Sequence, residues 1–351
     1  MTPKGGSLSL RRIFHALFTL GVSLLAFWFL WSVLPEGGLQ EVAERLRRAS
    51  LILLATGAAV TVLRFLVLAL RWEILLRVEA PVGLGQVAPV LMAGNFLNLV
   101  APVLRVAGPI LRAYYLSRET GKPRARFYGT IVADQTANFI PYTVATAVAG
   151  SMVTLNSGFS VSPVMAFGMI GSMVVGLYLC YLGVRRVARG GDVRVATLLL
   201  RSGPGRPVAV WRRRLAGWWS HLAHALATSL VGTRAWWPTV ALSFIIFGQV
   251  VAVQWLCFMA VGGRVGIAEA CFAIAGAGFV QIMAGAPGGV GVTEGSLVGV
   301  FVLLGLDTEI VVAAVLLARF LNYGVLLLWG GASFVFLQRR YGMPDPEPTA
   351  A

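Results

Sequence analysis

The chain has 351 residues, of which 58% are hydrophobic and 12% charged, and its formal net charge is +15. A water-soluble fold cannot bury so large an apolar fraction, so the composition predicts an integral membrane protein. The three cysteines all lie in apolar stretches and support neither a disulfide framework nor a thiolate metal site. The longest polar segment, about 30 residues from 185 to 214, is too short for a separate aqueous catalytic domain.

Residues 13–34 form the first predicted span. This apolar run exceeds the roughly 20 residues that a helix needs to cross a bilayer. It is also longer than the usual core of a signal peptide and lacks a small-residue cleavage pattern before Pro35. Residues 1–50 are therefore expected to form an N-terminal span followed by an amphipathic linker.

Further apolar runs predict additional membrane helices. Five of them are long enough to cross, which makes six full spans in all; they cover residues 51–76, 127–155, 161–183, 237–261 and 310–337. Two more apolar stretches, 84–116 and 268–306, are broken near their middle by proline and glycine. Each of these two stretches fits either two spans or one re-entrant hairpin.

The positions of the basic residues favour hairpins. If both broken stretches enter and leave on the same side, most of the 29 Lys and Arg residues fall on the cytoplasmic side, together with both termini. Each half-stretch has only about 15 residues, and broken helices are tolerated at membrane depth where they line a protein or water-filled cavity. We therefore expect an all-α integral membrane protein of a bacterial-type cytoplasmic (inner) membrane, with six full transmembrane helices and two re-entrant helical hairpins.

The hydropathy divides the chain into two halves. The first half, 51–183, and the second half, 236–340, each contain one broken stretch. The basic segment 184–235 between them is rich in arginine and tryptophan, and it fits either an interfacial helix or a solvated cytoplasmic loop. Residues 341–351 include three prolines and are expected to be a disordered tail.

The two halves resemble each other when Pro102 is aligned with Pro287. The same offset brings the polar Asp134 onto Arg319. With the predicted topology, the two units enter the membrane from opposite faces. Such an inverted repeat is typical of secondary transporters, which handle their substrate near the midplane between broken helices. The repeat therefore indicates transport.

Four charged residues are expected at membrane depth, where a central charge costs roughly 2.5 to 3.5 kcal/mol on insertion scales. They are Arg64, Asp134, Glu294 and Arg319. Because Asp134 and Arg319 are equivalent in the repeat, we expect them to approach each other across the pseudo-twofold axis. One interpretation is a permanent ion pair that locks two helices. The other is a binding site in which Arg64 and Arg319 hold a lipid phosphate.

Neighbouring polar residues extend this candidate binding site. Asn138 shares a helix face with Asp134, and Asn322 and Tyr323 share one with Arg319. Arg105 and Arg112 both lie in the second limb of the first broken stretch. They either guide a head group in from the cytoplasmic side or mark where that limb leaves the membrane.

The densest motif runs from Ala286 to Glu294. Pro287 fixes the break, and the glycines that follow it free the backbone to bend; they are Gly288, Gly289 and Gly291. We expect the tips near Pro102 and Pro287 to gate the two sides of the membrane. Glu294 either stabilises its tip at a helix N-terminus or takes part in gating or proton coupling. The lysine of a nucleotide-binding loop is absent from the motif.

Enzyme signatures are scarce. The sequence contains no zinc-protease motif, no Asp-x-Asp metal pair and no nucleophile elbow, so we expect no catalytic activity, no cofactor and no metal. The clustering of arginines in one membrane-flanking segment favours the positive-inside explanation over binding of nucleic acid.

These residues also carry a family resemblance. The chain resembles the flippase-like family of the lysylphosphatidylglycerol synthase transmembrane region over residues 50–340. The motif residues in the second half are Ala286 to Glu294, Gly305 and the helix 318–322, and those in the first half are Arg71, Trp72, Asn98, Pro102, Gly108 and Arg112. The chain departs from the family pattern between Arg105 and Pro109, where an acidic residue before an arginine is common, and at Gln135, where an arginine is common.

The resemblance implies a protein that moves, or helps to move, a lipid across the membrane. Relatives are associated with aminoacylated phospholipids, isoprenoid-linked sugars and hopanoids. The soluble aminoacyl-transferase domain has no counterpart in the sequence, so synthesis of lysylphosphatidylglycerol is not expected.

Our leading hypothesis is a lipid translocase that works by alternating access, with membrane lipids as its substrate. One alternative is a non-catalytic membrane partner of lipid-synthesising enzymes. The other is an intramembrane transferase acting on lipid head groups, for which Asp134 and Glu294 are the candidate carboxylate pair.

Overall fold

The computed structural model describes residues 38–100, 107–157, 235–284 and 292–342, and all regular structure in these segments is helical. The first half contains α2 (Gly38–Arg47), α3 (Leu51–Leu76), α4 (Leu84–Val100), α5 (Ala107–Thr120) and α6 (Arg124–Ser157). The second half contains α10 (Trp236–Ala260), α11 (Ile267–Ala284), α12 (Val292–Leu303), α13 (Thr308–Val325), the π-helical segment η3 (Leu326–Gly330) and α14 (Gly331–Tyr341).

Three helices are long and apolar enough to cross a membrane. They are α3, α10 and the continuous helix from Thr308 to Tyr341, which confirms the predicted runs 51–76, 237–261 and 310–337. A fourth predicted run, 127–155, lies within the 34-residue helix α6, which is more polar than these three. The runs 13–34 and 161–183 and the tail after residue 342 lie outside the described residues, so the number of six spans stays a prediction.

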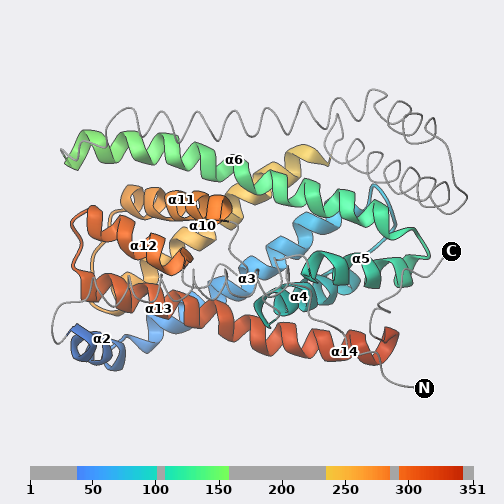
Figure 1. Ribbon diagram of the computed structural model, residues 1–351, viewed down its shortest axis with the longest axis horizontal. Helices are drawn as coiled ribbons and strands as arrows, with labels where there is room; N and C mark the ends of the chain where they lie inside the picture. Colours follow the sequence, from blue (N-terminus) through green and yellow to red (C-terminus); the bar gives the residue numbers. More distant parts are fainter. Residues whose placement is uncertain (1–37, 101–106, 158–234, 285–291, 343–351) are drawn as a thin grey trace, which may run out of the picture.

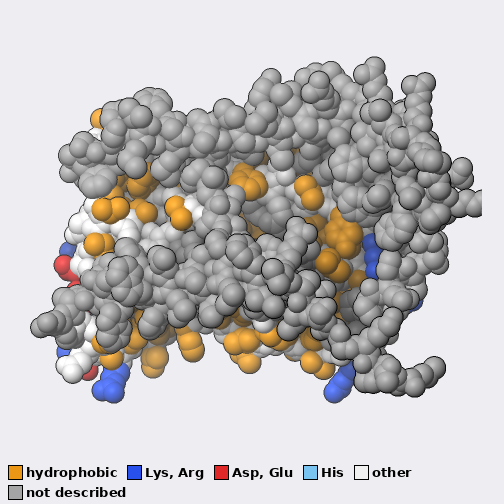
Figure 2. Space-filling model, in the orientation of Figure 1, with side chains coloured by type: hydrophobic (Ala, Val, Ile, Leu, Met, Phe, Trp, Pro, Cys, Tyr) orange, Lys and Arg blue, Asp and Glu red, His pale blue; other side chains and the backbone are white. Residues whose placement is uncertain are grey.

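The outside of the helix from Thr308 to Tyr341 is apolar. Figure 2 shows hydrophobic side chains along the edge of the molecule where Figure 1 places α13 and α14. Exposed residues of this helix include Leu316, Phe320, Leu327, Leu328, Val335 and Phe336. Two arginines, Arg339 and Arg340, follow in the last turn of α14. An apolar stretch that ends in basic residues is typical of a helix that leaves the hydrocarbon core at the membrane surface.

Each broken stretch is a pair of short helices packed against each other. The first hairpin consists of α4 and α5, and the second hairpin consists of α11 and α12. In Figure 1 the two hairpins occupy opposite halves of the long axis, and each has its open end at the outer side. The breaks, with Pro102 and Pro287, lie outside the described residues. How deep the hairpins reach into a bilayer stays a prediction.

The helix boundaries repeat between the two halves. Helices α3 and α10 begin at Leu51 and Trp236, which are separated by the same offset as the two prolines. Helices α6 and α13 begin at Arg124 and Thr308, one position short of that offset. A glycine with positive φ follows the second helix of each hairpin, and this left-handed conformation favours glycine and ends a helix. The helix starts of the two halves therefore follow the offset of the proline alignment to within one residue.

The packing repeats as well. Helices α3 and α10 pack against each other, α4 packs against α14, and α11 packs against α6. Helix α3 also packs on α13, as α10 does on α6. Figure 1 shows α6 and the α13–α14 helix running in opposite directions along the long axis. These contacts of one half thus have counterparts in the other, as a pseudo-twofold axis would produce.

The two long helices are also interrupted at equivalent positions. Pro141 lies inside α6, and the π-helical segment begins at Leu326, the residue that the proline alignment places opposite Pro141. Proline removes one backbone hydrogen bond from a helix, and a π segment replaces the regular i to i−4 pattern. Both helices are therefore weakened at the same level of the repeat.

Gly108 is required where α5 crosses α4. A Cβ atom at this position would lie 2.5 Å from the carbonyl oxygen of Gly94 and 2.5 Å from the side-chain nitrogen of Asn98. We expect Gly108→Ala to lower the free energy of unfolding by about 1 to 3 kcal/mol, because the backbone carbonyl cannot move aside. Equilibrium unfolding in mixed micelles measures this change.

The matched control is Gly85→Ala in the same hairpin, where a Cβ atom would meet nothing within 4 Å. This variant should be neutral or slightly stabilising, since alanine restricts the unfolded chain more than glycine does. Equal unfolding energies for the two variants would contradict the close packing of α4 and α5.

Candidate functional site

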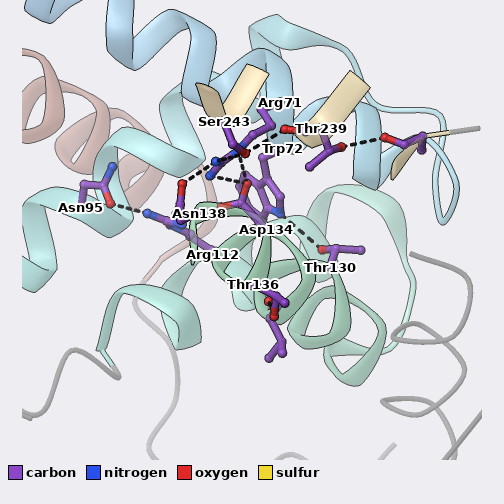
Figure 3. Close-up of polar contacts among 12 residues, drawn as sticks. Arg71, Trp72, Asn95, Arg112, Thr130, Asp134, Thr136, Asn138, Thr239 and Ser243 are labelled. Carbon is purple, nitrogen blue, oxygen red and sulfur yellow. Dashed lines mark hydrogen bonds and ion pairs between the residues drawn. The ribbon is translucent and has the colours of Figure 1, made fainter. Parts of the chain in front are cut away.

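Arg71 stands at the centre of a buried polar cluster that joins α3, α6 and α10 (Figure 3). Its side chain is fully buried, and its Nε and Nη2 atoms each lie 2.8 Å from Oδ1 of Asp134. Nη1 donates to Oδ1 of Asn138 and, over 2.9 Å, to Oγ of Ser243. A buried guanidinium is tolerated when a carboxylate and further oxygens compensate its charge. This cluster has the character of a structural ion pair.

The expected pairing of Asp134 with Arg319 is wrong. Asp134 pairs with Arg71, whereas Arg319 pairs with Glu294 over 3.0 Å. The reason is that α6 packs directly against α3, and α13 packs directly against α12, so each acid meets an arginine of its own half. The sequence shows Arg71 within a predicted span, but hydropathy gives no indication of which helix it faces.

Glu294 and Arg319 form the second ion pair. Glu294 lies in the first turn of α12, where the helix dipole favours a carboxylate, and it is 8% exposed. The hydroxyl of Tyr323 donates to the same Oε1 atom over 3.3 Å. The predicted tip residues Pro287, Gly288, Gly289 and Gly291 lie outside the described residues.

Arg64 connects α3 to α13, and no ion pair with an acid is found for it in the described part of the chain. Its Nη2 atom donates to Oδ1 of Asn322, and its buried Nε atom has no hydrogen-bond partner in the described part of the chain. The guanidinium lies 4.9 Å from the centre of the Phe65 ring. Neutral amide and aromatic contacts compensate a positive charge only partly.

Arg112 is arranged in the same way inside the first hairpin. It is 5% exposed, and its Nη2 atom donates to Oδ1 of Asn95 on α4 (Figure 3). Its Nε atom is buried without a partner among the described residues, and its guanidinium lies 5.5 Å from the ring centre of Trp72. Gly94 leaves room for this side chain, since a Cβ atom there would lie 2.6 Å from Nε.

Two cavities meet at these residues. The larger, of about 550 Å³, lies on the side of the first hairpin and is lined by Asn95, Asn98 and Arg112 among others. The smaller, of about 190 Å³, lies on the side of the second hairpin and is lined by Gly278 and Thr293 among others. Both cavities share three lining residues, which are Arg64, Arg319 and Asn322. These three residues therefore stand between the two cavities.

The smaller cavity also has a polar lining. The Nε2 atom of Gln254 and the Oγ1 atom of Thr293 are buried and have no hydrogen-bond partner among the described residues. Buried polar atoms are normally satisfied by protein, water or ligand. A cavity with unpaired donors and acceptors on its wall is thus suited to water or to the polar part of a ligand.

The structure brings together five of the eight predicted substrate-binding residues. Arg64, Arg112, Arg319, Asn322 and Tyr323 line the larger cavity. Asp134 and Asn138 belong to the Arg71 cluster and are not among the lining residues of either cavity. Arg105 lies outside the described residues.

Sequence reasoning missed Asn95 as a site residue and assigned Asn98 no role beyond the resemblance. The spacing of these two residues could have identified them, because asparagines at i and i+3 in an apolar helix lie on the same face.

Comparison with known proteins gives matches over nearly the whole chain. The family described as the lysylphosphatidylglycerol synthase TM region matches residues 16–330. A UPF0104 membrane protein of Pyrococcus horikoshii is 19% identical over 323 residues, which are 90% of this chain and 95% of the relative. Two UPF0104 membrane proteins of Methanothermobacter thermautotrophicus are 24% and 22% identical, over 91% and 82% of this chain and 94% and 84% of their own lengths.

Proposed function

Since this chain belongs to the family of the lysylphosphatidylglycerol synthase TM region, we propose that it is a lipid translocase that moves a lipid between the two leaflets by alternating access. Membership of this family indicates a multi-pass membrane protein with a lipid-related role. The proposal that this role is translocation depends on the arrangement of the two cavities.

The main support for the proposal is that the two cavities share three lining residues. One cavity adjoins the first hairpin and the other adjoins the second, and Arg64, Arg319 and Asn322 line both. A head group that passes from one cavity to the other therefore keeps contact with the same arginines throughout. Such a fixed site between two hairpins related by a pseudo-twofold axis is the arrangement on which alternating access depends.

An amphipathic substrate suits this arrangement. Its head group requires a polar cavity, because every unpaired polar group in hydrocarbon costs free energy. Its acyl or isoprenoid tails can remain in the bilayer beside the apolar outside of α3 and of the helix from Thr308 to Tyr341. In this scheme the two hairpin tips gate the cavities, and the ion pair between Glu294 and Arg319 opens and closes with the passage of the head group.

The charges at the two ends of the molecule support an orientation with both termini in the cytoplasm. Basic residues predominate where α3 ends, α6 begins and α14 ends; they are Arg77, Arg118, Lys122, Arg124, Arg126, Arg339 and Arg340. Contacts such as Arg340 with Glu119, at 3.7 Å, hold this end together. The opposite end carries Arg45, Arg47, Arg48 and Arg264 beside more numerous acids, so the positive-inside rule favours the first end as cytoplasmic.

Reconstitution of the purified full-length protein in vesicles tests the proposal. Fluorescent acyl-labelled phospholipids are quenched from outside with dithionite, which is membrane-impermeant, so the protected fraction measures how much lipid stays in the inner leaflet. We expect vesicles with the protein to lose this protection at least tenfold faster than vesicles without it. Equal rates with native protein, with heat-denatured protein and with none, across all lipids tested, would overturn translocation.

A further inference from the structure

The larger cavity carries more positive charge than its surroundings compensate. Three arginines line it, namely Arg64, Arg112 and Arg319, and the described lining residues include no acid. Only Arg319 has a carboxylate partner, Glu294, among the described residues.

Arg71 provides a comparison, because its charge is compensated as expected for a structural arginine. Its guanidinium is held by the carboxylate of Asp134 and by the oxygens of Asn138 and Ser243. Arg112 is nearly as deeply buried, but no ion pair is found for it among the described residues. Its direct contacts there are the amide oxygen of Asn95 and the face of Trp72, and the carboxylate that attracts it, that of Asp134, is already paired with Arg71. Because a buried charge without a counter-ion is costly, the contrast indicates that an anion from outside the chain completes the cavity.

The asparagines of the cavity add a second, independent observation. Oδ1 of Asn95 accepts from Arg112, and Oδ1 of Asn322 accepts from Arg64. Oδ1 of Asn98 accepts from the backbone N–H of Gly108 over 2.7 Å. Each of these three amide oxygens already accepts one hydrogen bond within the protein, and each amide also carries an NH₂ group that can donate.

The cavity therefore offers hydrogen-bond donors on every one of these six side chains. A ligand group that only accepts, such as a phosphoryl oxygen, can bind to all of them. An ammonium group carries the same charge as the three arginines, so their repulsion disfavours its binding in this cavity.

From this lining, and resting on the proposed translocation, we infer that the substrate is a lipid whose head group is a phosphomonoester or diphosphate with no amino group. Arg64 and Arg112, for which the described residues form no ion pair, match the two negative charges of such a group. Arginine pairs with phosphate through two parallel hydrogen bonds, which fixes the orientation of the head group as well as its charge. Aminoacylated and other amine-bearing head groups are selected against by the same residues.

The test compares four acyl-labelled lipids in vesicles that contain the full-length protein. Phosphatidic acid carries a phosphomonoester, and phosphatidylglycerol carries a singly charged diester. Phosphatidylethanolamine adds an ammonium group, and the aminoacylated lipid, lysylphosphatidylglycerol, carries two ammonium groups and a net positive head group. We expect phosphatidic acid to move at least tenfold faster than the aminoacylated lipid, with the other two between them.

Variants then connect this preference to the cavity. Arg112→Gln should slow phosphatidic acid by about tenfold to a hundredfold, the usual effect of losing hydrogen bonds to a charged group. Arg118→Gln removes an exposed arginine from the same helix and should leave the rate unchanged. Asn95→Asp is nearly isosteric, yet it supplies a carboxylate that competes with the phosphate for Arg112. It should slow phosphatidic acid and narrow the difference from the amine-bearing lipids.

The possible outcomes separate the two proposals. If no lipid moves faster than in empty vesicles, translocation fails and this inference fails with it. If lipids move, but the aminoacylated lipid moves as fast as phosphatidic acid or faster, translocation stands and the proposed head group is wrong. A further arm uses radiolabelled inorganic diphosphate, because a free anion offers the same oxygens. Uptake of diphosphate without any lipid movement would show that the substrate is not a lipid. It would support only the inference that the cavity binds phosphoryl groups.

Discussion

Asp134→Ala is expected to lower the free energy of unfolding by about 3 to 5 kcal/mol, the usual cost of removing one partner from a buried ion pair. The reason is that Arg71 is fully buried and would keep its charge with only the oxygens of Asn138 and Ser243 beside it. Equilibrium unfolding in mixed micelles, followed by tryptophan fluorescence, measures the loss.

Two further variants make this result specific. The double replacement Arg71→Met with Asp134→Leu removes both charges and should recover most of the stability, because apolar residues of similar volume can replace a buried pair. Glu41→Gln breaks the exposed pair with Arg45 and should cost less than about 1 kcal/mol. A cost for Asp134→Ala as small as that of Glu41→Gln would show that the cluster does not hold the helices together.

Arg319→Ala is expected to slow lipid translocation by roughly tenfold to a hundredfold, the effect of losing charge-assisted hydrogen bonds of about 1.5 to 3 kcal/mol. Arg319 lines both cavities, so in the proposed mechanism it would contact the head group on either side of its passage. Arg319→Lys should recover part of the rate, since lysine keeps the charge but not the planar fork. The vesicle assay with labelled lipid measures the translocation rate of the native protein, of Arg319→Ala and of Arg319→Lys.

The control for this prediction is Arg339→Ala, which removes an arginine from the far end of the same long helix. Its rate should equal that of the native protein. Arg319→Ala also leaves Glu294 without its arginine, so the unfolding energy of each variant is measured alongside the rate. Equal translocation by native protein and by a folded Arg319→Ala variant would remove the proposed site.

Hydropathy and the proline alignment predicted the helices well, for a physical reason. Runs of apolar residues report which segments lie in hydrocarbon, and this gave α3, α10 and the helix from Thr308 to Tyr341. Proline and glycine report where a helix has to stop, and the two broken stretches are indeed pairs of helices. The offset between Pro102 and Pro287 recurs in the starts of α3 and α10.

The partners of the buried charges could not be predicted in the same way. Hydropathy gives the depth of a residue but not the direction in which it faces around the helix axis. Residues that are equivalent in a repeat touch only if they lie close to the symmetry axis. Helices α3 and α10 occupy the central contact, and α6 and α13 pack on them from outside. Asp134 and Arg319 therefore meet arginine and glutamate of their own halves instead of each other.

The matched interruptions of the long helices, Pro141 in α6 and the π segment from Leu326 to Gly330, have a consequence for how the molecule can bend. A helix that lacks regular hydrogen bonds at one level flexes there more cheaply than elsewhere. Each long helix thus has a point at which it bends more easily, and the two ends of the bundle can tilt independently about these two points. Rocking of this kind would move the outer parts of the helices while leaving Arg64 and its neighbours nearly still.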